Sequence, residues 1–341
     1  MTPVERVLAA AGLEPVDRAP VLPVLLQQGA RMLDIPLKSY FGEPIRLAEG
    51  QSRLIDRFNH DAVFAFPHIV QDTLPWGAGM DFHDGGPPSV NHMVITRYED
   101  IGELITPDPC AHPYLRNTLR AAEELARRYK GDRLIVGAVI GPFSLPSMLM
   151  GMGKALALLI HHEEYRRNYF PILMEHMMAY TQRWAQAQLD AGCDLVVLAE
   201  GMASASLLTQ ATFLEYALPT IQQWMAGVKG LVGLEMVGDA LPFMSHLRDL
   251  PCAALLVGST DRLRDVRKIL GHQKLIIGNI NNLKLLHWDA ERVEFEARRA
   301  IKEAGPGFAL CNQGPEIPWH VPDENIEALV RAAHSTQLAI A

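Results

Sequence analysis

Carboxylates, amides and imidazoles recur at the ends of short apolar runs in this chain, which is where α/β proteins place their chemistry. Near the C-terminus, the run Gly307–Cys311 stops at Asn312-Gln313-Gly314 and opens into a proline-rich loop that carries Glu316 and His320. A helix start is expected near Asp323, because carboxylates favour the first turn of a helix. The pattern predicts a buried strand, a polar loop and a helix, in that order.

Two carboxylates and one imidazole at such positions are the candidates for proton transfer. Glu200 follows the run Asp194–Ala199, Glu235 lies near the end of Leu231–Met236, and His68 follows Ala62–Phe66. A carboxyl group buried beside a second carboxylate has a raised pKa and can serve as a general acid. We predict catalytic roles for Glu235, His68 and Glu200. Each carboxylate could instead cap a following helix, and His68 could be a hydrogen-bonded core histidine.

The other polar residues at the predicted strand ends include very few Lys or Arg. A pocket built from them is expected to be polar, somewhat acidic and poor in permanent positive charge, which disfavours phosphate esters and polycarboxylates as substrates. The run Met148, Met150 and Met152 is more typical of adaptable packing than of ligand contact, although such loops also line sites for bulky ligands. The predicted substrate-binding residues are Gln27, Gln28, Phe143, Ser144, Asp239, Asn279, Asn281, Asn312, Gln313, Glu316 and His320. The asparagines among residues 279–282 could also only build a turn.

Eight apolar runs of strand length must position these residues. Continuous Val, Ile and Leu runs are typical of buried parallel strands, and helical patterns separate most of them. The predicted strands are Val21–Leu26, Ala62–Phe66, Leu134–Ile140, Asp194–Ala199, Leu231–Met236, Ala253–Val257, Lys274–Ile280 and Gly307–Cys311. The main predicted helices between them are Pro113–Lys130, Glu163–Ala191, Phe213–Val228, Asp261–Leu270 and Ala290–Ala304. This alternation predicts an α/β fold, a (β/α)8 barrel.

Two segments lie outside the repeat. Met1–Leu13 is predicted to be an extra N-terminal helix. Met80–Tyr98 is predicted to be an inserted β-hairpin, in which Asp84-Gly85-Gly86-Pro87-Pro88 is followed by Val90–Thr96. No linker or second core is evident, so residues 1–341 are predicted to form a single domain.

Composition excludes several classes of protein. The 341 residues carry a formal net charge of -8, which argues against a nucleic-acid binder. No apolar run is long enough to span a membrane, and the first residues do not resemble a signal peptide. The four cysteines are widely spaced without a C-x-x-C pair, which suits a reducing compartment. We therefore expect a cytoplasmic protein.

The order and spacing of several motifs resemble the uroporphyrinogen decarboxylase superfamily and, within it, the methylcobamide:coenzyme M methyltransferase branch. The similarity covers essentially the whole chain, and no single motif in it is specific. It rests on Arg18–Val24, the hairpin segment Gly86–Asp100, Gly141-Pro142-Phe143-Ser144-Leu145, Ala191–Asp194, Gly278-Asn279 and Pro322–Val330. The resemblance implies a (β/α)8 barrel, in agreement with the eight predicted strands.

The chain departs from the decarboxylases of that superfamily at three places. Where they hold a four-carboxylate tetrapyrrole with an Arg-Gln-Ala-Gly-Arg-like segment, this chain has Gln27-Gln28-Gly29-Ala30-Arg31. Their essential aspartate corresponds to His68, and their late histidine falls on Pro315. The resemblance therefore disfavours decarboxylation of a porphyrinogen.

The chain also departs from the thiol-methylating branch. Those enzymes bind zinc through a His-x-Cys pair and a later Cys, and the corresponding positions here are Glu235, Val237 and Pro315. A thiolate zinc site lacks its ligands at these positions, so zinc is not expected, although Glu235 with His68, His320 or Cys311 leaves a metal site open.

These departures leave three hypotheses. The first is a methyltransferase that moves a methyl group from a small O- or N-methylated substrate to the cobalt of a corrinoid (cobalamin). The corrinoid is expected to be carried by a separate corrinoid-binding protein, which is the expected partner. The second is a decarboxylase of a smaller acid, with Arg31 holding a carboxylate. The third is a non-catalytic barrel that binds a small molecule or tetrapyrrole. A homodimer is the expected oligomer, as in related proteins.

Overall fold

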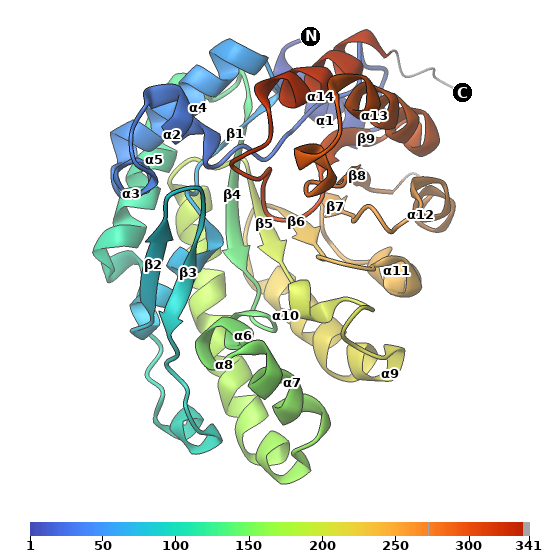
Figure 1. Ribbon diagram of the computed structural model, residues 1–341. Coiled ribbons are helices and arrows are strands. Elements are labelled where there is room, and N and C mark those ends of the chain that lie inside the picture. The colour runs from blue at the N-terminus through green and yellow to red at the C-terminus, as the bar shows by residue number, and fades with distance from the viewer. Residues whose placement is uncertain (272, 337–341) are drawn as a thin grey trace.

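The computed structural model describes residues 1–271 and 273–336. Its parallel strands curl into a sheet with helices on the outside (Figure 1). In spatial order the strands are β1 Ala62–Phe64, β4 Leu134–Ile140, β5 Leu195–Ala199, β6 Leu231–Glu235, β7 Ala254–Leu256, β8 Leu275–Ile280 and β9 Phe308–Asn312. Each pairs in parallel with the next. The predicted (β/α)8 barrel is confirmed, with seven of its eight strands regular.

The first predicted strand is the irregular one. Val21 makes a parallel bridge to Leu310 of β9, and its carbonyl accepts a 2.9 Å hydrogen bond from the N–H of Asp61, just before β1. This segment therefore closes the ring between the last and first strands of the sheet. Pro20 and Pro23 lack the N–H groups that a longer ladder needs. The expectation of a regular strand over residues 21–26 is wrong for that reason.

The helices pack around this ring, and their order follows the predicted alternation. They are α1 Pro3–Ala11, α2 Gln28–Leu33, α3 Leu37–Gly42, α4 Pro44–Phe58, α5 Pro113–Tyr129, α6 Leu145–Met150, α7 Met152–Ile160, α8 Glu163–Asp190, α9 Gln210–Thr212, α10 Leu218–Gly227, α11 Met244–Leu247, α12 Leu263–Leu270, α13 Ala290–Ala304 and α14 Asp323–Ser335. The N-terminal helix α1 is confirmed, and a capping box between Thr2 and Glu5 starts it. None of the helices described is long and apolar enough to cross a membrane.

The inserted hairpin is also confirmed, with a corrected second strand. It consists of β2 Gly79–His83 and β3 Gly86–His92, joined at Asp84-Gly85. The second strand therefore begins immediately after the turn and includes Pro87 and Pro88, whereas Val90–Thr96 was predicted. Proline is tolerated there because the hairpin has only two strands, so each strand has an unpaired edge.

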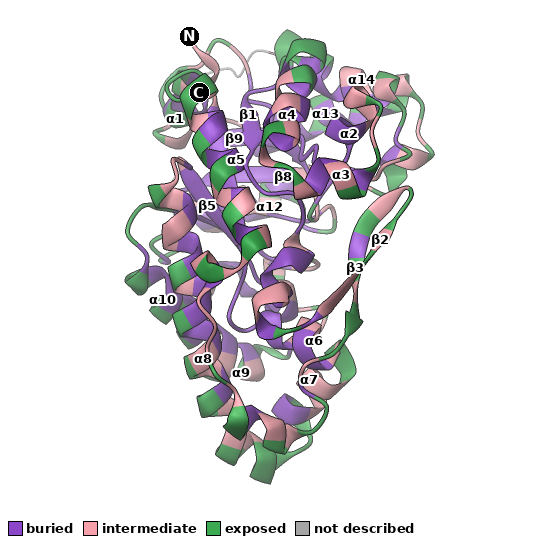
Figure 2. Ribbon diagram, turned by 90° about the vertical axis from the view of Figure 1, so that its left-hand side faces the viewer, coloured by how far each residue is buried: buried purple, intermediate pink, exposed green. Residues whose placement is uncertain are grey.

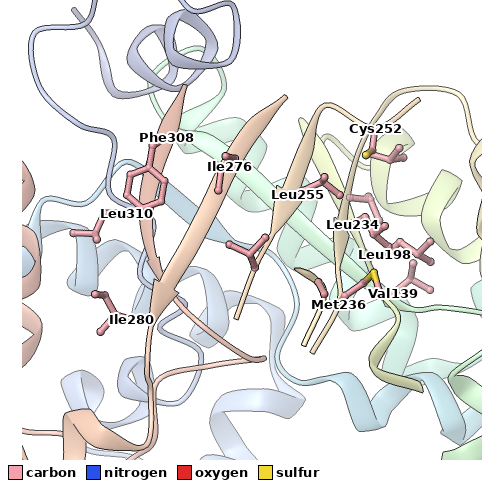
Figure 3. Close-up of a cluster of buried hydrophobic side chains, with 14 of the residues drawn as sticks. Val139, Leu198, Leu234, Met236, Cys252, Leu255, Ile276, Ile280, Phe308 and Leu310 are labelled. Carbon is pink, nitrogen blue, oxygen red and sulfur yellow. The ribbon is translucent and has the colours of Figure 1, made fainter. Parts of the chain in front are cut away.

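Successive residues of each strand point alternately to the outside of the sheet, under the helices, and to the interior of the barrel. Leu198, Leu234, Leu255 and Ile276 point to the outer layer, where they belong to the core that the helices cover (Figure 3). Their neighbours, such as Val197 and Ile277, turn inward and form a second apolar cluster inside the barrel. Exposed residues gather on the outward faces of the helices (Figure 2). The inward layer determines the lining of the cavity described next.

Candidate functional site

A cavity of about 420 Å³ enters the barrel interior, and we call it the apolar chamber. Most of its wall is the inward layer of the strands, including Phe64, Val136, Ala138, Leu195, Val197, Leu256 and Ile277. Met148 and Met152 add to the wall from the α6–α7 region. Its polar side chains are Ser144, Ser147, Ser204, Ser206 and Glu235, with the Cys311 thiol. No Lys or Arg of the described residues lines it.

A second cavity of about 430 Å³ adjoins the first, and we call it the polar chamber. It is lined by the carboxylate of Asp239 and by hydroxyl and amide side chains, namely Ser206, Ser259, Thr260, Asn281, Asn282, Asn312 and Gln313. The two chambers share Ser206, Glu235, Val237, Gly238, Leu256, Gly314 and Pro315. The described lining of this chamber also contains no Lys or Arg. The described linings of both chambers are poor in positive charge, as predicted, whereas the predicted polar lining is found in the polar chamber and not in the apolar one.

Glu235 is the ionisable group that both chambers share. It ends β6 in register with Ala199 of β5, and both side chains face the apolar chamber. The side chain is buried, and no donor in the described part of the chain hydrogen-bonds to its carboxyl group. Burial alone raises its pKa to about 7, because a low dielectric disfavours the charged form. A carboxyl group in this state can exchange a proton near neutral pH.

Glu200 lies on the neighbouring strand end but points elsewhere. It follows Ala199 by one residue, and in a strand a shift of one residue turns the side chain to the opposite face. Its carboxylate accepts hydrogen bonds from the N–H of Phe143 (3.1 Å) and the hydroxyl of Ser144 (2.6 Å), and burial raises its pKa to about 7. Glu200 lines neither chamber. Its geometry fits a residue that holds the 141–144 loop, not the predicted catalytic acid.

His68 is likewise placed away from the chambers. Its Nδ1 accepts a 3.2 Å hydrogen bond from the N–H of Gln71 at the start of a short helix, Ile69–Trp76. Its Nε2 therefore carries the hydrogen and donates to the hydroxyl of Tyr114 (2.8 Å). Burial lowers the pKa of His68 to about 3, so the ring is neutral at pH 7. The predicted catalytic role does not fit this geometry, and the alternative of a hydrogen-bonded core histidine does.

Five of the predicted substrate-binding residues do line a chamber. Ser144 lines the apolar one, and Asp239, Asn281, Asn312 and Gln313 line the polar one. Several of their polar atoms also form hydrogen bonds to neighbouring segments at the strand ends. Gln313 accepts a 2.6 Å hydrogen bond from the N–H of Ser259, and Asn312 accepts one of 2.8 Å from the N–H of Val24. Asn281 donates to the hydroxyl of Ser259 (3.1 Å).

The other six predicted substrate-binding residues line neither chamber. They are Gln27, Gln28, Phe143, Asn279, Glu316 and His320. Gln28 donates to the carbonyl oxygens of Ile317 (2.8 Å) and Pro318 (3.1 Å), which ties α2 to the last loop. Asn279 donates to the carbonyls of Gly258 and Asp261. Gln27 and Glu316 are buried behind the rim, and burial raises the pKa of Glu316 to about 7. His320 is exposed and lies against the hairpin turn at Gly85.

Several lining residues were not among the predicted site residues. Ser204 is buried in the wall of the apolar chamber, and its hydroxyl has no hydrogen-bond partner in the described structure. Gly238 adopts a φ of 100°, and a Cβ there would meet the hydroxyl of Ser206 at 2.9 Å. Met148 and Met152 line the same chamber. The methionine run was a usable signal, whereas the inward strand residues were indistinguishable from ordinary core.

Comparison with known proteins identifies the family to which the chain belongs. The model of the uroporphyrinogen decarboxylase (URO-D) family matches residues 2–336. The chain belongs to this family. It is 28% identical to a uroporphyrinogen decarboxylase of Methylobacillus flagellatus over 82% of this chain and 80% of that protein. It is 26% identical to the methylcobamide:CoM methyltransferase MtaA of Methanosarcina barkeri over 72% of this chain and 70% of that one.

The fold comparison agrees with this URO-D family assignment. A methyltransferase from Methanosarcina mazei superposes with a TM-score of 0.87 at 21% identity, covering 98% of both chains. A B12-independent methionine synthase from Shewanella superposes more loosely, with a TM-score of 0.52. At these identities the likeness establishes the fold alone. The similar proteins include enzymes of both named activities, so the choice between them depends on the residues of this chain.

The three positions that correspond to the zinc ligands of the thiol-methylating branch lie together around the chambers of this URO-D member. Glu235, Val237 and Pro315 all line both chambers. Val and Pro offer no side-chain ligand, and Cys311 donates its S–H to the carbonyl of Leu22 at 2.9 Å. Burial raises the pKa of the Cys311 thiol, which disfavours the thiolate that zinc prefers. Within the described residues, no three His, Cys, Asp or Glu side chains form a metal-binding group. These donors do not fit a structural or thiol-activating zinc site.

Proposed function

We propose that this URO-D family member is a methyltransferase that takes a methyl group from a small O- or N-methylated donor. The acceptor is the cobalt of a corrinoid carried by a separate protein. Glu235 is proposed as the general acid that protonates the leaving group of the donor. The observation that carries the proposal is the buried, unpaired carboxyl group at the junction of the two chambers, whose pKa is about 7.

The proposed role of Glu235 follows from charge balance. When the bond between the methyl carbon and the donor oxygen or nitrogen breaks, its electron pair stays on the heteroatom. A positioned acid that delivers a proton to that heteroatom avoids a free alkoxide, phenoxide or amide anion. Burial keeps a large fraction of Glu235 protonated at neutral pH. The corrinoid, when presented, supplies the nucleophile that accepts the methyl group.

The chambers constrain the donor that we propose. A volume of about 420 Å³ lies in the lower part of the usual range for ligand pockets, roughly 300–1,000 Å³, and suits a small donor. The apolar wall favours a donor whose body is apolar. The absence of Lys and Arg from the described lining of both chambers disfavours a carboxylate or phosphate on the donor. A neutral methyl ether with an apolar body, or an N-methylated donor bound in its uncharged form, matches these conditions best.

The decarboxylase alternative loses support at Arg31, the residue expected to hold a carboxylate. Arg31 donates to the carbonyl of Trp319 (2.8 Å) and pairs with Asp323. It lines neither chamber. A substrate with four carboxylates would enter chambers that offer no cation from the described residues, at a large desolvation cost. We therefore do not retain decarboxylation as a second function.

A methyl-transfer assay with defined donors tests the proposal. The purified chain is mixed with a reduced corrinoid protein and, in separate reactions, with methanol, methylamines and methoxylated aromatics. Methylation of the corrinoid is followed by its visible spectrum. Wild-type protein is expected to methylate the corrinoid with at least one donor class, and Glu235→Gln to do so far more slowly. Equal rates in the two proteins, or no methyl transfer from any donor, would overturn the proposal.

A further inference from the structure

A third cavity, which we call the basic pocket, opens beside the end of β8 and has a volume of about 340 Å³. It lies between the loop after β8 and one face of α13. Its lining consists of Ser259, Asn279, Ile280, Asn281, Lys284, Trp288, Arg292, Glu296 and Arg299. It shares Ser259 and Asn281 with the polar chamber and shares no residue with the apolar chamber. Its chemistry therefore differs from that of the two chambers already described.

The basic pocket concentrates positive charge in a protein whose formal net charge is -8. Among the described residues, three cations and one carboxylate, that of Glu296, line it. Glu296 is buried and pairs with both Arg292 and Arg299, with a distance of 2.7 Å to the Arg299 guanidinium. Arg299 also reaches Glu303 at 3.2 Å. Lys284 has no carboxylate within ion-pair distance among the described residues, and it is exposed. The lining of the pocket thus keeps an excess of positive charge.

The donors in the basic pocket are arranged around an aromatic ring. The ammonium of Lys284 and the guanidinium of Arg292 each lie 5.9 Å from the centre of the Trp288 ring. These cation–π contacts place both cations beside the same aromatic ring. The hydroxyl of Ser259 accepts a hydrogen bond from Asn281, which leaves its own hydrogen available for a ligand. Several cationic and hydroxyl donors around one cavity match the demands of a tetrahedral oxyanion.

The position of the basic pocket in the barrel supports the same ligand. Counting the Val21 segment as the first strand, β8 is the seventh strand of the ring. In (β/α)8 barrels, the loops after the seventh and eighth strands frequently form a phosphate-binding site. We propose that the basic pocket binds a phosphoryl group, free or carried by an organic molecule, with Lys284 and Arg292 as its principal ligands. This inference is independent of the methyl-transfer proposal, because it uses no residue of the apolar chamber.

Calorimetric titration of the full chain, at low and constant ionic strength, tests the inference with three probes: inorganic phosphate, pyrophosphate and phenyl phosphate. Saturable binding of one phosphoryl group per chain is expected. Tighter binding of phenyl phosphate than of phosphate assigns the site to an organic phosphate that also contacts Trp288. Equal binding assigns it to the phosphoryl group alone.

Two variants make the test specific. Lys284→Gln combined with Arg292→Gln is expected to weaken binding by about tenfold for each cation removed. The matched control is Arg298→Gln, on the same helix but on another face, where Arg298 pairs with Glu294 at 2.7 Å. The control is expected to bind like wild type, and thermal unfolding shows that both variants fold. The inference is overturned if no probe binds saturably, or if the double variant binds as tightly as the control.

Discussion

The apolar and polar chambers share a wall but differ in the composition of their linings and in which of their polar groups have hydrogen-bond partners. In the polar chamber, side chains such as Gln313 and Asn312 hydrogen-bond to backbone N–H groups of the rim. In the apolar chamber, Ser144 and Cys311 also have partners, whereas the hydroxyl of Ser204 lacks one in the described structure, as does the carboxyl group of Glu235 that both chambers share. A buried polar group without a partner costs free energy. Ser204 and Glu235 are therefore the groups of this wall that a bound polar ligand would supply with hydrogen bonds.

Three buried carboxylates at the barrel rim have similar pKa values but differ in their access to the chambers. Glu200, Glu235 and Glu316 all have a pKa raised to about 7 by burial. Of these, Glu235 alone lines the chambers. A raised pKa therefore does not identify the proposed acid, because burial produces it wherever a carboxyl group is enclosed. Access to a cavity that can hold a donor separates Glu235 from the other two.

The largest expected effect is the loss of rate in Glu235→Gln. Removing a general acid lowers kcat by roughly 10²–10⁴-fold, while the donor still fits the unchanged apolar wall and KM changes little. Methyl transfer is measured under saturating donor. Glu316→Gln is the matched control, because its pKa is also raised but it lines neither chamber. An equal loss of kcat in both variants would remove the distinction between them.

The pH dependence of the same rate has a defined sign. The proposed acid acts in its protonated form, so wild-type kcat is expected to fall as pH rises through about 7. This fall is expected to be absent from the residual rate of Glu235→Gln. A wild-type kcat that rises through pH 7 would mean that Glu235 acts as a base or has no part in the reaction.

Stability is expected to change with pH for the same physical reason. The pKa of Glu235 is raised from 4.5 to about 7 in the folded chain, so the folded state binds more protons between these values. The stabilisation is complete below pH 4.5 and is lost as pH rises through 7, by on the order of 3 kcal/mol. Glu235→Gln removes this contribution. Urea unfolding at pH 5 and pH 8 should show a smaller pH-dependent difference for the variant than for wild type.

The two faces of the inner strands allow the apolar chamber to be tested separately from the core. Ala138 lines the chamber, so Ala138→Leu extends into open volume and is expected to raise the KM of the donor about tenfold to a hundredfold. Leu198 points to the outer layer, so Leu198→Ala is expected to lower the free energy of unfolding by about 2–5 kcal/mol without a change in KM. Kinetics and urea unfolding of both variants check this. A rise of KM in Leu198→Ala alone would reverse the assignment of the faces.

The smallest expected effect is in the polar chamber. Gln313→Ala removes the 2.6 Å hydrogen bond to the N–H of Ser259. The N–H can then bond to water in the chamber, so the loss of stability is expected to be about 1 kcal/mol. KM is expected to change only a few-fold, because the donor body is proposed to lie in the apolar chamber. A loss of kcat as large as that of Glu235→Gln would place the reaction in the polar chamber instead.

The sequence by itself determined the fold. Continuous Val, Ile and Leu runs separated by helical patterns specify a parallel ring, because such strands must be buried on both faces. The exception, the Val21 segment, could also have been anticipated from Pro20 and Pro23. The sequence also predicted the position of Glu235 at a strand end and the scarcity of Lys and Arg at the rim.

Only the tertiary structure decided which strand-end residues face a cavity. Glu200 and Glu235 look alike in the sequence, but β5 and β6 pair Ala199 with Glu235 and so turn Glu200 the other way. The side chain of Glu200 fits against the 141–144 loop because Gly141 has no side chain. A Cβ on Gly141 would lie 2.0 Å from the Glu200 carboxylate. Strand register and close approach between distant segments are set by packing of the whole ring. A linear sequence holds no local signal for either.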